Sequence, residues 1–149
     1  MQYVSTHPRT GSGCLRIFNS SPNISRYITK TLPSAYTDLY IGFGLWIAST
    51  TPLDANLTPV SVPILTLRST TAVQQLTVGL NESTNTIMVH RGTNGGTLLG
   101  STSLPVTVDT LHYIELHVVI SDTDGVVQIR QNGTLTLDLS AQDTNNAGG

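Results

Sequence analysis

Apolar and polar residues alternate along several short stretches of the chain. In the clearest of them, residues 111–121, one side carries apolar side chains and the other carries mostly polar ones. The apolar side holds Ile114, Leu116, Val118 and Ile120, and the opposite side holds Tyr113, Glu115 and His117. A period of two residues is typical of a strand with one buried face. The pattern therefore predicts a half-buried β-strand.

Two more strands follow, each after a turn signal. Asp124-Gly125 and Asn132-Gly133 are dipeptides typical of tight hairpin turns, which need positive φ angles. The strand at 126–131 is predicted to point Val127 and Ile129 inward. The strand at 134–139 is predicted to point Leu135, Leu137 and Leu139 inward, and Thr134, Thr136 and Asp138 outward. The three strands predict a meander over one contiguous core made of Ile114, Leu116, Val118, Val127, Ile129, Leu135 and Leu137.

The same alternation recurs upstream. It predicts strands at 14–19, 25–32, 39–49, 63–69, 75–81, 86–91 and 97–103. No segment of ten or more residues shows the helical period of 3.6. Prolines and clusters of Gly or Asn separate the stretches, and residues 50–62 form the one long irregular excursion. About ten short strands at this spacing predict an all-β fold, an antiparallel two-sheet β-sandwich.

Composition limits the classes of partner. The chain has 149 residues, 7 Lys and Arg against 9 Asp and Glu, and a net charge of -2. Binding to nucleic acid relies on many cationic contacts to phosphates, so no nucleic-acid partner is expected. No apolar run reaches the roughly 18 residues of a membrane helix, and no membrane partner is expected. The single cysteine, Cys14, excludes an intrachain disulfide and a cysteine-based zinc site.

Three stretches carry a family resemblance. They are GSGCLRIFNSSPNISRYITKTL (11–32), YIGFGLWIAS (40–49) and the block 64–139, which ends with HYIELHVVISDTDGVVQIRQNGTLTLDL. Together they resemble the concanavalin A-like (laminin G-like) jelly-roll domains of bacteriophage structural proteins. Leu111-His112 stands where the family often has a Trp before the tyrosine. The resemblance covers nearly the whole chain and implies a single jelly-roll domain over residues 1–149.

The resemblance also implies a function. It points to a non-enzymatic structural protein of the virion of a tailed bacteriophage, either a capsid decoration protein or a component of the tail or its fibres. Such a protein would act through contacts with other virion proteins, as a homo-oligomer or a multi-copy assembly. The low charge and the many Ser and Thr residues suit a surface that packs against neighbours through hydrogen bonds.

Catalysis is tested directly, because the family includes β-glucanases. Those enzymes use two carboxylates at a fixed spacing, one as nucleophile and one as general acid. The chain has two glutamates, Glu82 and Glu115, and neither has another carboxylate in that motif. No catalytic residue, no cofactor and no enzymatic activity are expected.

A carbohydrate groove is the alternative function. Tyr40 and Trp46 lie on the same face of the predicted strand 39–49, together with Gly42 and Gly44. The two glycines could leave a shallow groove between the aromatic rings for a sugar. A sheet or loop could instead cover this face, with Trp46 filling the space above the glycines. The first arrangement predicts a carbohydrate-binding module or an adhesin that recognises surface glycans on a host.

The histidines invite a metal interpretation, since imidazole is a common metal ligand. They are His7, His90, His112 and His117. His112 and His117 lie five residues apart on one predicted strand, so their side chains point to opposite faces and cannot chelate one ion as a pair. Positions facing solvent on β-strands account for these residues, and no metal site is expected.

Asp122 and Asp124 flank a predicted turn. Laminin G-like relatives often bind calcium through loop carboxylates, because calcium prefers oxygen ligands. Asp is also common in turns because its side chain accepts hydrogen bonds from nearby backbone N–H groups. The turn interpretation is preferred here, and the calcium interpretation stays open.

The C-terminal residues 141–149 form a polar stretch that resembles a turn leading to another strand. In the family that the chain resembles, such a strand usually returns to pair near the first strands and closes the sheet. Without that strand, we expect the edge beside residues 14–19 to lack its partner. An unpaired edge is a template for strand addition. We therefore expect either that the sequence stops short of the native C-terminus or that a neighbouring subunit supplies the strand.

Overall fold

The computed structural model describes residues 2–4, 14–16, 28–47, 61–81 and 83–146. The chain divides into two compact units, Met1–Ser34 and Ala35–Gly149. In the first unit, β1 (Gln2–Val4) pairs antiparallel with β2 (Cys14–Arg16). The sequence pattern predicted the start of β2 but not β1. β2 is therefore paired along one of its edges, and the closing strand expected beside residues 14–19 stays a prediction.

The prediction of a strand at 25–32 is wrong for residues 28–32, the part that the structure describes. Residues 28–32 have no strand structure, and all of them are exposed. Alternation marks a strand only where a neighbouring layer covers the apolar side. Here Ile28 and Leu32 are both exposed.

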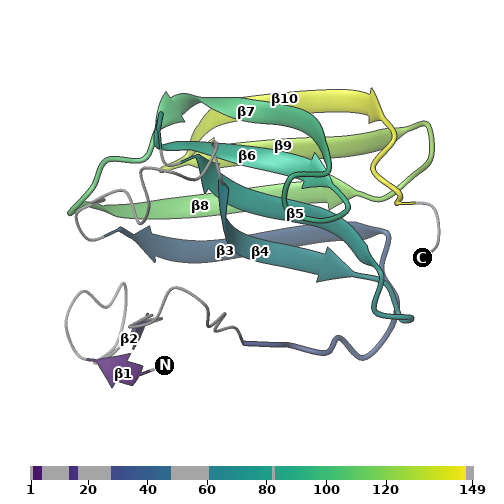
Figure 1. Ribbon diagram of the computed structural model, residues 1–149, viewed down its shortest axis with the longest axis horizontal. Helices are drawn as coiled ribbons and strands as arrows, with labels where there is room; N and C mark the ends of the chain where they lie inside the picture. Colours follow the sequence, from purple (N-terminus) through teal and green to yellow (C-terminus); the bar gives the residue numbers. More distant parts are fainter. Residues whose placement is uncertain (1, 5–13, 17–27, 48–60, 82, 147–149) are drawn as a thin grey trace. The chain divides into compact units, whose positions relative to one another are not determined.

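The second unit is a sandwich of two four-stranded antiparallel sheets (Figure 1). The first, called here the β8 sheet, has the order β10-β9-β8-β3 and consists of β3 (Asp38–Trp46), β8 (Leu111–Val119), β9 (Gly125–Gln131) and β10 (Thr134–Gln142). The second, the β5 sheet, has the order β4-β5-β6-β7 and consists of β4 (Ser61–Arg68), β5 (Gln74–Asn81), β6 (Thr86–Arg91) and β7 (Thr97–Pro105). The predicted all-β two-sheet sandwich is confirmed, and the finer jelly-roll topology stays a prediction.

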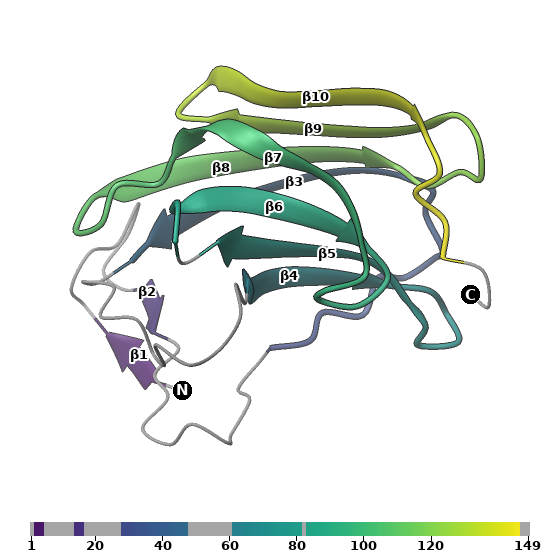
Figure 2. The ribbon, with the colours of Figure 1, turned by 45° about the horizontal axis from the view of Figure 1, so that its top comes forward.

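The core lies between the two sheets, which face each other in Figure 2. Its buried apolar side chains are Leu76, Val78, Leu80, Ile87, Val89, Val106, Ile114, Leu116, Val118, Val127, Ile129 and Leu137. Strands β8 and β9 supply alternate residues to it, as the pattern predicted. The unbroken burial of residues 75–80 shows that β5 is covered on both faces.

Leu135 departs from the predicted core. Its side chain is 38% exposed, whereas Thr136 is buried and donates a hydrogen bond from Oγ1 to the carbonyl of Ile129 over 3.2 Å. The pairing of β10 with β9 shifts between Leu135 and Leu137. A β-bulge of this kind turns the residues before it to the other face, which a strict period of two cannot anticipate.

The two predicted hairpin turns differ in the structure. Asn132 and Gly133 have φ angles of 51° and 84°, as the turn signal predicted. Gly125 is not among the residues with positive φ and belongs to β9, so its predicted role was wrong. A Cβ on Gly125 would overlap Thr144 Oγ1 and lie 2.6 Å from the carbonyl oxygen of Gln142. This glycine is needed because another part of the backbone passes close to it.

The turn before Gly125 is held by a serine. Ser121 Oγ accepts hydrogen bonds from the backbone N–H groups of Thr123 (3.3 Å) and Asp124 (3.1 Å). The capping role expected of the aspartates is therefore performed by Ser121. Asp122 instead accepts a hydrogen bond from Asn145 Nδ2 over 2.9 Å.

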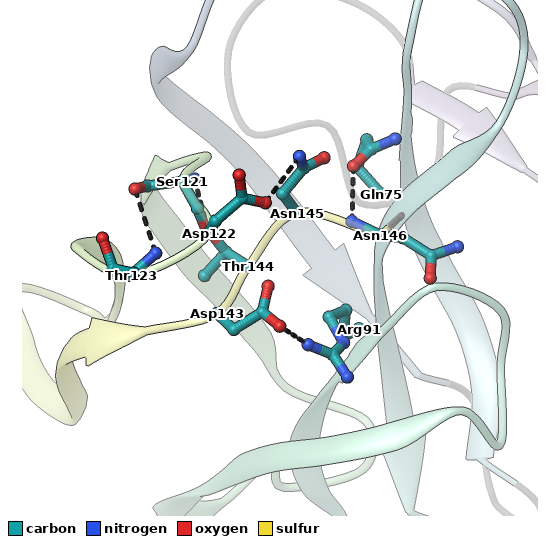
Figure 3. A network of polar contacts seen from close by, with 9 residues as sticks. All are labelled: Gln75, Arg91, Ser121, Asp122, Thr123, Asp143, Thr144, Asn145 and Asn146. Carbon is teal, nitrogen blue, oxygen red and sulfur yellow. Dashed lines mark hydrogen bonds and ion pairs between the residues drawn. The ribbon is translucent and has the colours of Figure 1, made fainter. Parts of the chain in front are cut away.

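Residues 143–146, called here the C-terminal strap, bind the turn between β8 and β9 (Figure 3). Thr144 is fully buried, and its Oγ1 donates to the carbonyl of Val119 over 2.7 Å and accepts from the N–H of Ser121 over 2.9 Å. The N–H of Thr144 in turn donates to the carbonyl of Ser121 over 2.9 Å. The strap thus satisfies backbone groups at the end of the β8 sheet that would otherwise need other partners.

The same strap also reaches the β5 sheet. The N–H of Asn146 donates to Gln75 Oε1 over 2.8 Å, and Asn146 Nδ2 donates to the carbonyl of Gln74 over 3.0 Å. Asp143 forms an ion pair with Arg91, the last residue of β6 (Figure 3). The strap therefore joins the two sheets at one end of the sandwich.

Two histidines expected to face solvent are buried. His90 is 5% exposed, and His112 shares the inward face of β8 with Ile114. His112 Nε2 accepts a hydrogen bond from the N–H of Thr107 over 3.0 Å, which compensates its burial. His112 and His117 do lie on opposite faces, as predicted. His7 lies outside the described residues.

Burial lowers the pKa of His90, because desolvation disfavours the charged imidazolium. It lies between Thr77 on β5 and Leu98 on β7, and its Nδ1 has no hydrogen-bond partner among the described residues. An unfolded chain takes up a proton at this residue below about pH 6.5, whereas the folded chain resists doing so. Stability is therefore expected to fall as the pH falls through and below 6.5.

Urea unfolding at pH 8, 6.5 and 5.5 checks this expectation. The His90→Leu variant should lose less stability than the wild-type protein between pH 8 and pH 5.5. Parallel curves for the two proteins would show that His90 does not cause the pH dependence.

No helix in the described part of the chain is long and apolar enough to cross a membrane.

Candidate ligand-binding groove

The face of the β8 sheet that points away from the core carries aromatic and polar side chains. Strand register aligns them in two rows across the sheet. The first row is Tyr40, His117, Gln128 and Asp138, and the second is Gly42, Glu115, Arg130 and Leu135. Neighbouring positions two residues apart on a strand are separated by about 7 Å, so the rows adjoin each other.

Tyr40 provides an exposed aromatic ring. Its side chain is 77% exposed, and the ring stacks on the imidazole of His117 with 4.0 Å between centroids and 4° between planes. His117 covers one face of the tyrosine ring and supports it from the neighbouring strand. The ring is therefore presented to solvent in a fixed orientation.

Polar contacts hold His117 in place. Its Nε2 lies 3.0 Å from Asp38 Oδ1, and its Nδ1 lies 3.4 Å from Gln128 Oε1. Gln128 Nε2 donates to Asp138 Oδ1 over 2.8 Å. The contacts link all four strands of the β8 sheet, from Asp38 on β3 to Asp138 on β10, and make the support for Tyr40 rigid.

The second row carries two charged groups that do not pair with each other, the carboxylate of Glu115 and the guanidinium of Arg130. Glu115 and Arg130 lie directly opposite each other on β8 and β9. Among the described residues they form no ion pair with each other, and Glu115 has no hydrogen-bond partner. Arg130 Nη1 makes one long contact, 3.5 Å, to the carbonyl of Gly133. Both groups remain able to bind something else.

Gly42 makes room for Tyr113. A Cβ on Gly42 would overlap Tyr113 Oη and lie 3.1 Å from Cζ of the same ring. The phenol of Tyr113 therefore crosses from β8 over the backbone of β3. The space that the sequence pattern left above this glycine is filled by Tyr113.

These side chains line a groove of about 480 Å³. Its lining consists of Tyr40, Ile41, Gly42, Tyr113, Glu115, Leu116, His117, Gln128 and Arg130. A volume of this size suits a small ligand, and aromatic surface with a few convergent polar groups is typical of such sites. In the described part of the chain, no group of three or more His, Cys, Asp or Glu side chains could hold a metal ion.

Only one of the two ligand-binding residues predicted from the sequence lies in the groove. Tyr40 lines the groove, whereas Trp46 lies at the far end of β3, opposite Leu111 and outside the lining. The polar partners of Tyr40, namely His117, Glu115, Gln128 and Arg130, were not selected. Their signal was present as the polar sides of the predicted strands 111–121 and 126–131. Their register against Tyr40 depends on the pairing of β3 with β8, which are separated in the sequence by the strands of the β5 sheet.

No protein-family model, no curated protein and no solved structure matches the chain.

Proposed function

We propose that the protein is a non-enzymatic carbohydrate-binding module and that the groove is its glycan site. The observation that carries this proposal is the exposed ring of Tyr40, supported by His117 and placed beside the hydrogen-bonding side chains of Glu115, Gln128 and Arg130. A sugar ring has an apolar C–H face and a rim of hydroxyl groups. The tyrosine ring matches the face, and Glu115, Gln128 and Arg130 match the rim.

The set of carboxylates supports binding without hydrolysis. Glycoside hydrolases use a pair of carboxyl groups on either side of the scissile bond. Glu115 is the only carboxylate among the described residues that line the groove. Asp38 and Asp138 lie nearby, but each accepts a contact from a neighbouring side chain of the first row.

A glycan array with purified wild-type protein and Tyr40→Ala tests this function. We expect the wild-type protein to retain at least one class of oligosaccharide and Tyr40→Ala to bind it more than tenfold more weakly, because the stacking surface is lost. Tyr36→Ala is the matched control, since Tyr36 is also an exposed tyrosine but lies outside the groove lining.

Trp46→Ala separates the groove from the site first expected from the sequence. Trp46 lies outside the lining, so its loss should leave glycan affinity within a factor of two or three. Equal binding by wild type and Tyr40→Ala, or loss of binding in Trp46→Ala at unchanged stability, would contradict the proposed site.

A second proposal concerns where the protein acts. The family resemblance and exposed apolar side chains on edge strands favour a multi-copy component of the virion of a tailed bacteriophage, in its capsid, tail or fibres. Leu98 and Leu104 are both exposed on β7, which is an edge strand of the β5 sheet. Exposed apolar side chains of this kind are typical of contacts between proteins.

Mass spectrometry of purified particles, with copy numbers, tests the second proposal. Hundreds of copies would favour a capsid decoration protein, and a handful would favour a tail fibre or adhesin. Absence of the chain from intact particles would contradict a virion role. A glycan groove is compatible with either location.

A further inference from the structure

Glu115 and Arg130 form an unusual pair in the lining of the groove. Residues directly opposite each other on antiparallel strands have Cβ atoms about 5 Å apart, and opposite charges at such positions usually attract. These two side chains lie opposite each other, and yet they form no ion pair. The groove therefore offers a strong acceptor and a strong donor side by side.

We infer that the groove selects an uncharged sugar whose neighbouring hydroxyl groups bridge Glu115 and Arg130. The inference rests on the proposed glycan site and specifies the chemical class of its ligand. A hydroxyl group can donate one hydrogen bond and accept others. One hydroxyl of a vicinal pair donates to the Glu115 carboxylate, while its neighbour accepts from the Arg130 guanidinium.

Charge distinguishes this ligand from the alternatives. The carboxylate of a uronic or sialic acid that approaches Arg130 meets Glu115 on the adjacent strand, with Asp38 and Asp138 in the neighbouring row. The ammonium group of an amino sugar that approaches Glu115 meets Arg130. Like charges at this separation repel, and an uncharged diol satisfies both groups without that penalty.

The first row sets the orientation of the sugar. A ring that stacks on the exposed face of Tyr40 lies about 7 Å along the strands from Glu115 and Arg130. This distance is about the width of a hexose with its hydroxyl groups. The stacked ring therefore extends its hydroxyl edge over the second row, or places the next sugar of a chain there.

A matched ligand comparison tests the inference. The probes are neutral hexose oligosaccharides, polygalacturonate oligosaccharides and sialylated oligosaccharides on one array, followed by calorimetry with the best neutral and the best acidic ligand. The proteins are wild type, Tyr40→Ala, Glu115→Gln and Arg130→Gln. Asp109→Asn removes the same charge as Glu115→Gln at an exposed position outside the groove lining.

We expect the wild-type protein to bind neutral oligosaccharides at least tenfold more tightly than acidic ones. Glu115→Gln should weaken neutral binding several-fold and strengthen acidic binding, whereas Asp109→Asn should change neither ratio. Arg130→Gln should weaken neutral binding without creating acidic binding.

Two results separate failure of the inference from failure of the site. Acidic oligosaccharides bound as tightly as neutral ones, with both lost in Tyr40→Ala, would overturn the selection of uncharged sugars and keep the glycan site. Binding that does not depend on Tyr40, or no binding to any class, would overturn both.

Discussion

Replacement of Leu116 by alanine is expected to lower the free energy of unfolding by about 2–5 kcal/mol. Leu116 is 2% exposed and lies at the middle of β8, between β3 and β9 in the sheet and against the β5 sheet across the core. Its truncation removes apolar contacts and leaves a cavity that the well-packed sandwich cannot fill. Urea unfolding measured by fluorescence gives the free energy.

Thr134→Ala is the control for Leu116→Ala. Thr134 is exposed at the start of β10, and its truncation should change stability by less than about 0.5 kcal/mol. Thr136 is unsuitable, because the bulge in β10 buries it. If the two variants were equally stable, the inward register of β8 would be wrong.

Replacement of Gly125 by alanine is the second large effect expected. The added Cβ would overlap the side chain of Thr144 and lie 2.6 Å from the carbonyl oxygen of Gln142, so the backbone of the C-terminal strap has to move. Strain of this kind costs about 1–3 kcal/mol. Displacement of the strap should also expose the backbone N–H groups of Ser121 and Thr144 to hydrogen exchange.

Ser140→Ala serves as the control for the strap. Ser140 is exposed two residues before Gln142, and its truncation should leave both stability and amide exchange nearly unchanged. Wild-type stability and unchanged protection at Ser121 and Thr144 in Gly125→Ala would show that the strap is not packed against Gly125.

Much of the sandwich could be predicted from alternation alone. Strand β6 matches its predicted range, and β5, β8 and β9 differ from theirs by one or two residues at the ends. Each of these strands is covered by the other sheet, so the apolar positions in its sequence mark the residues that face the core. The predicted strand at 25–32 failed in its described residues because no layer covers their apolar side chains.

The remaining errors come from contacts between residues far apart in the sequence. Gly125 has the sequence of a turn glycine, but its role depends on Thr144. Leu135 follows the alternation of its strand, but a bulge turns it outward. Such features depend on register and on close approach between strands, which a local pattern does not contain.

One part of the groove could be predicted from the sequence, and the part that depends on strand pairing could not. Tyr40 could be selected because it lies beside a glycine on the polar face of its own strand. Its partners Glu115 and Arg130 occupy the polar faces of two other strands, and their alignment follows from the pairing of β3 with β8. Trp46 was selected for its aromatic ring and for sharing a face of the strand with Tyr40, but it lies too far along β3 to line the groove.

A crystal structure of the protein with a neutral oligosaccharide from the array tests the central claim most directly. We expect a sugar ring stacked on the exposed face of Tyr40, with adjacent hydroxyl groups within hydrogen-bond distance of Glu115 and Arg130. A sugar bound beside Trp46, or on any other face while the groove holds none, would contradict it.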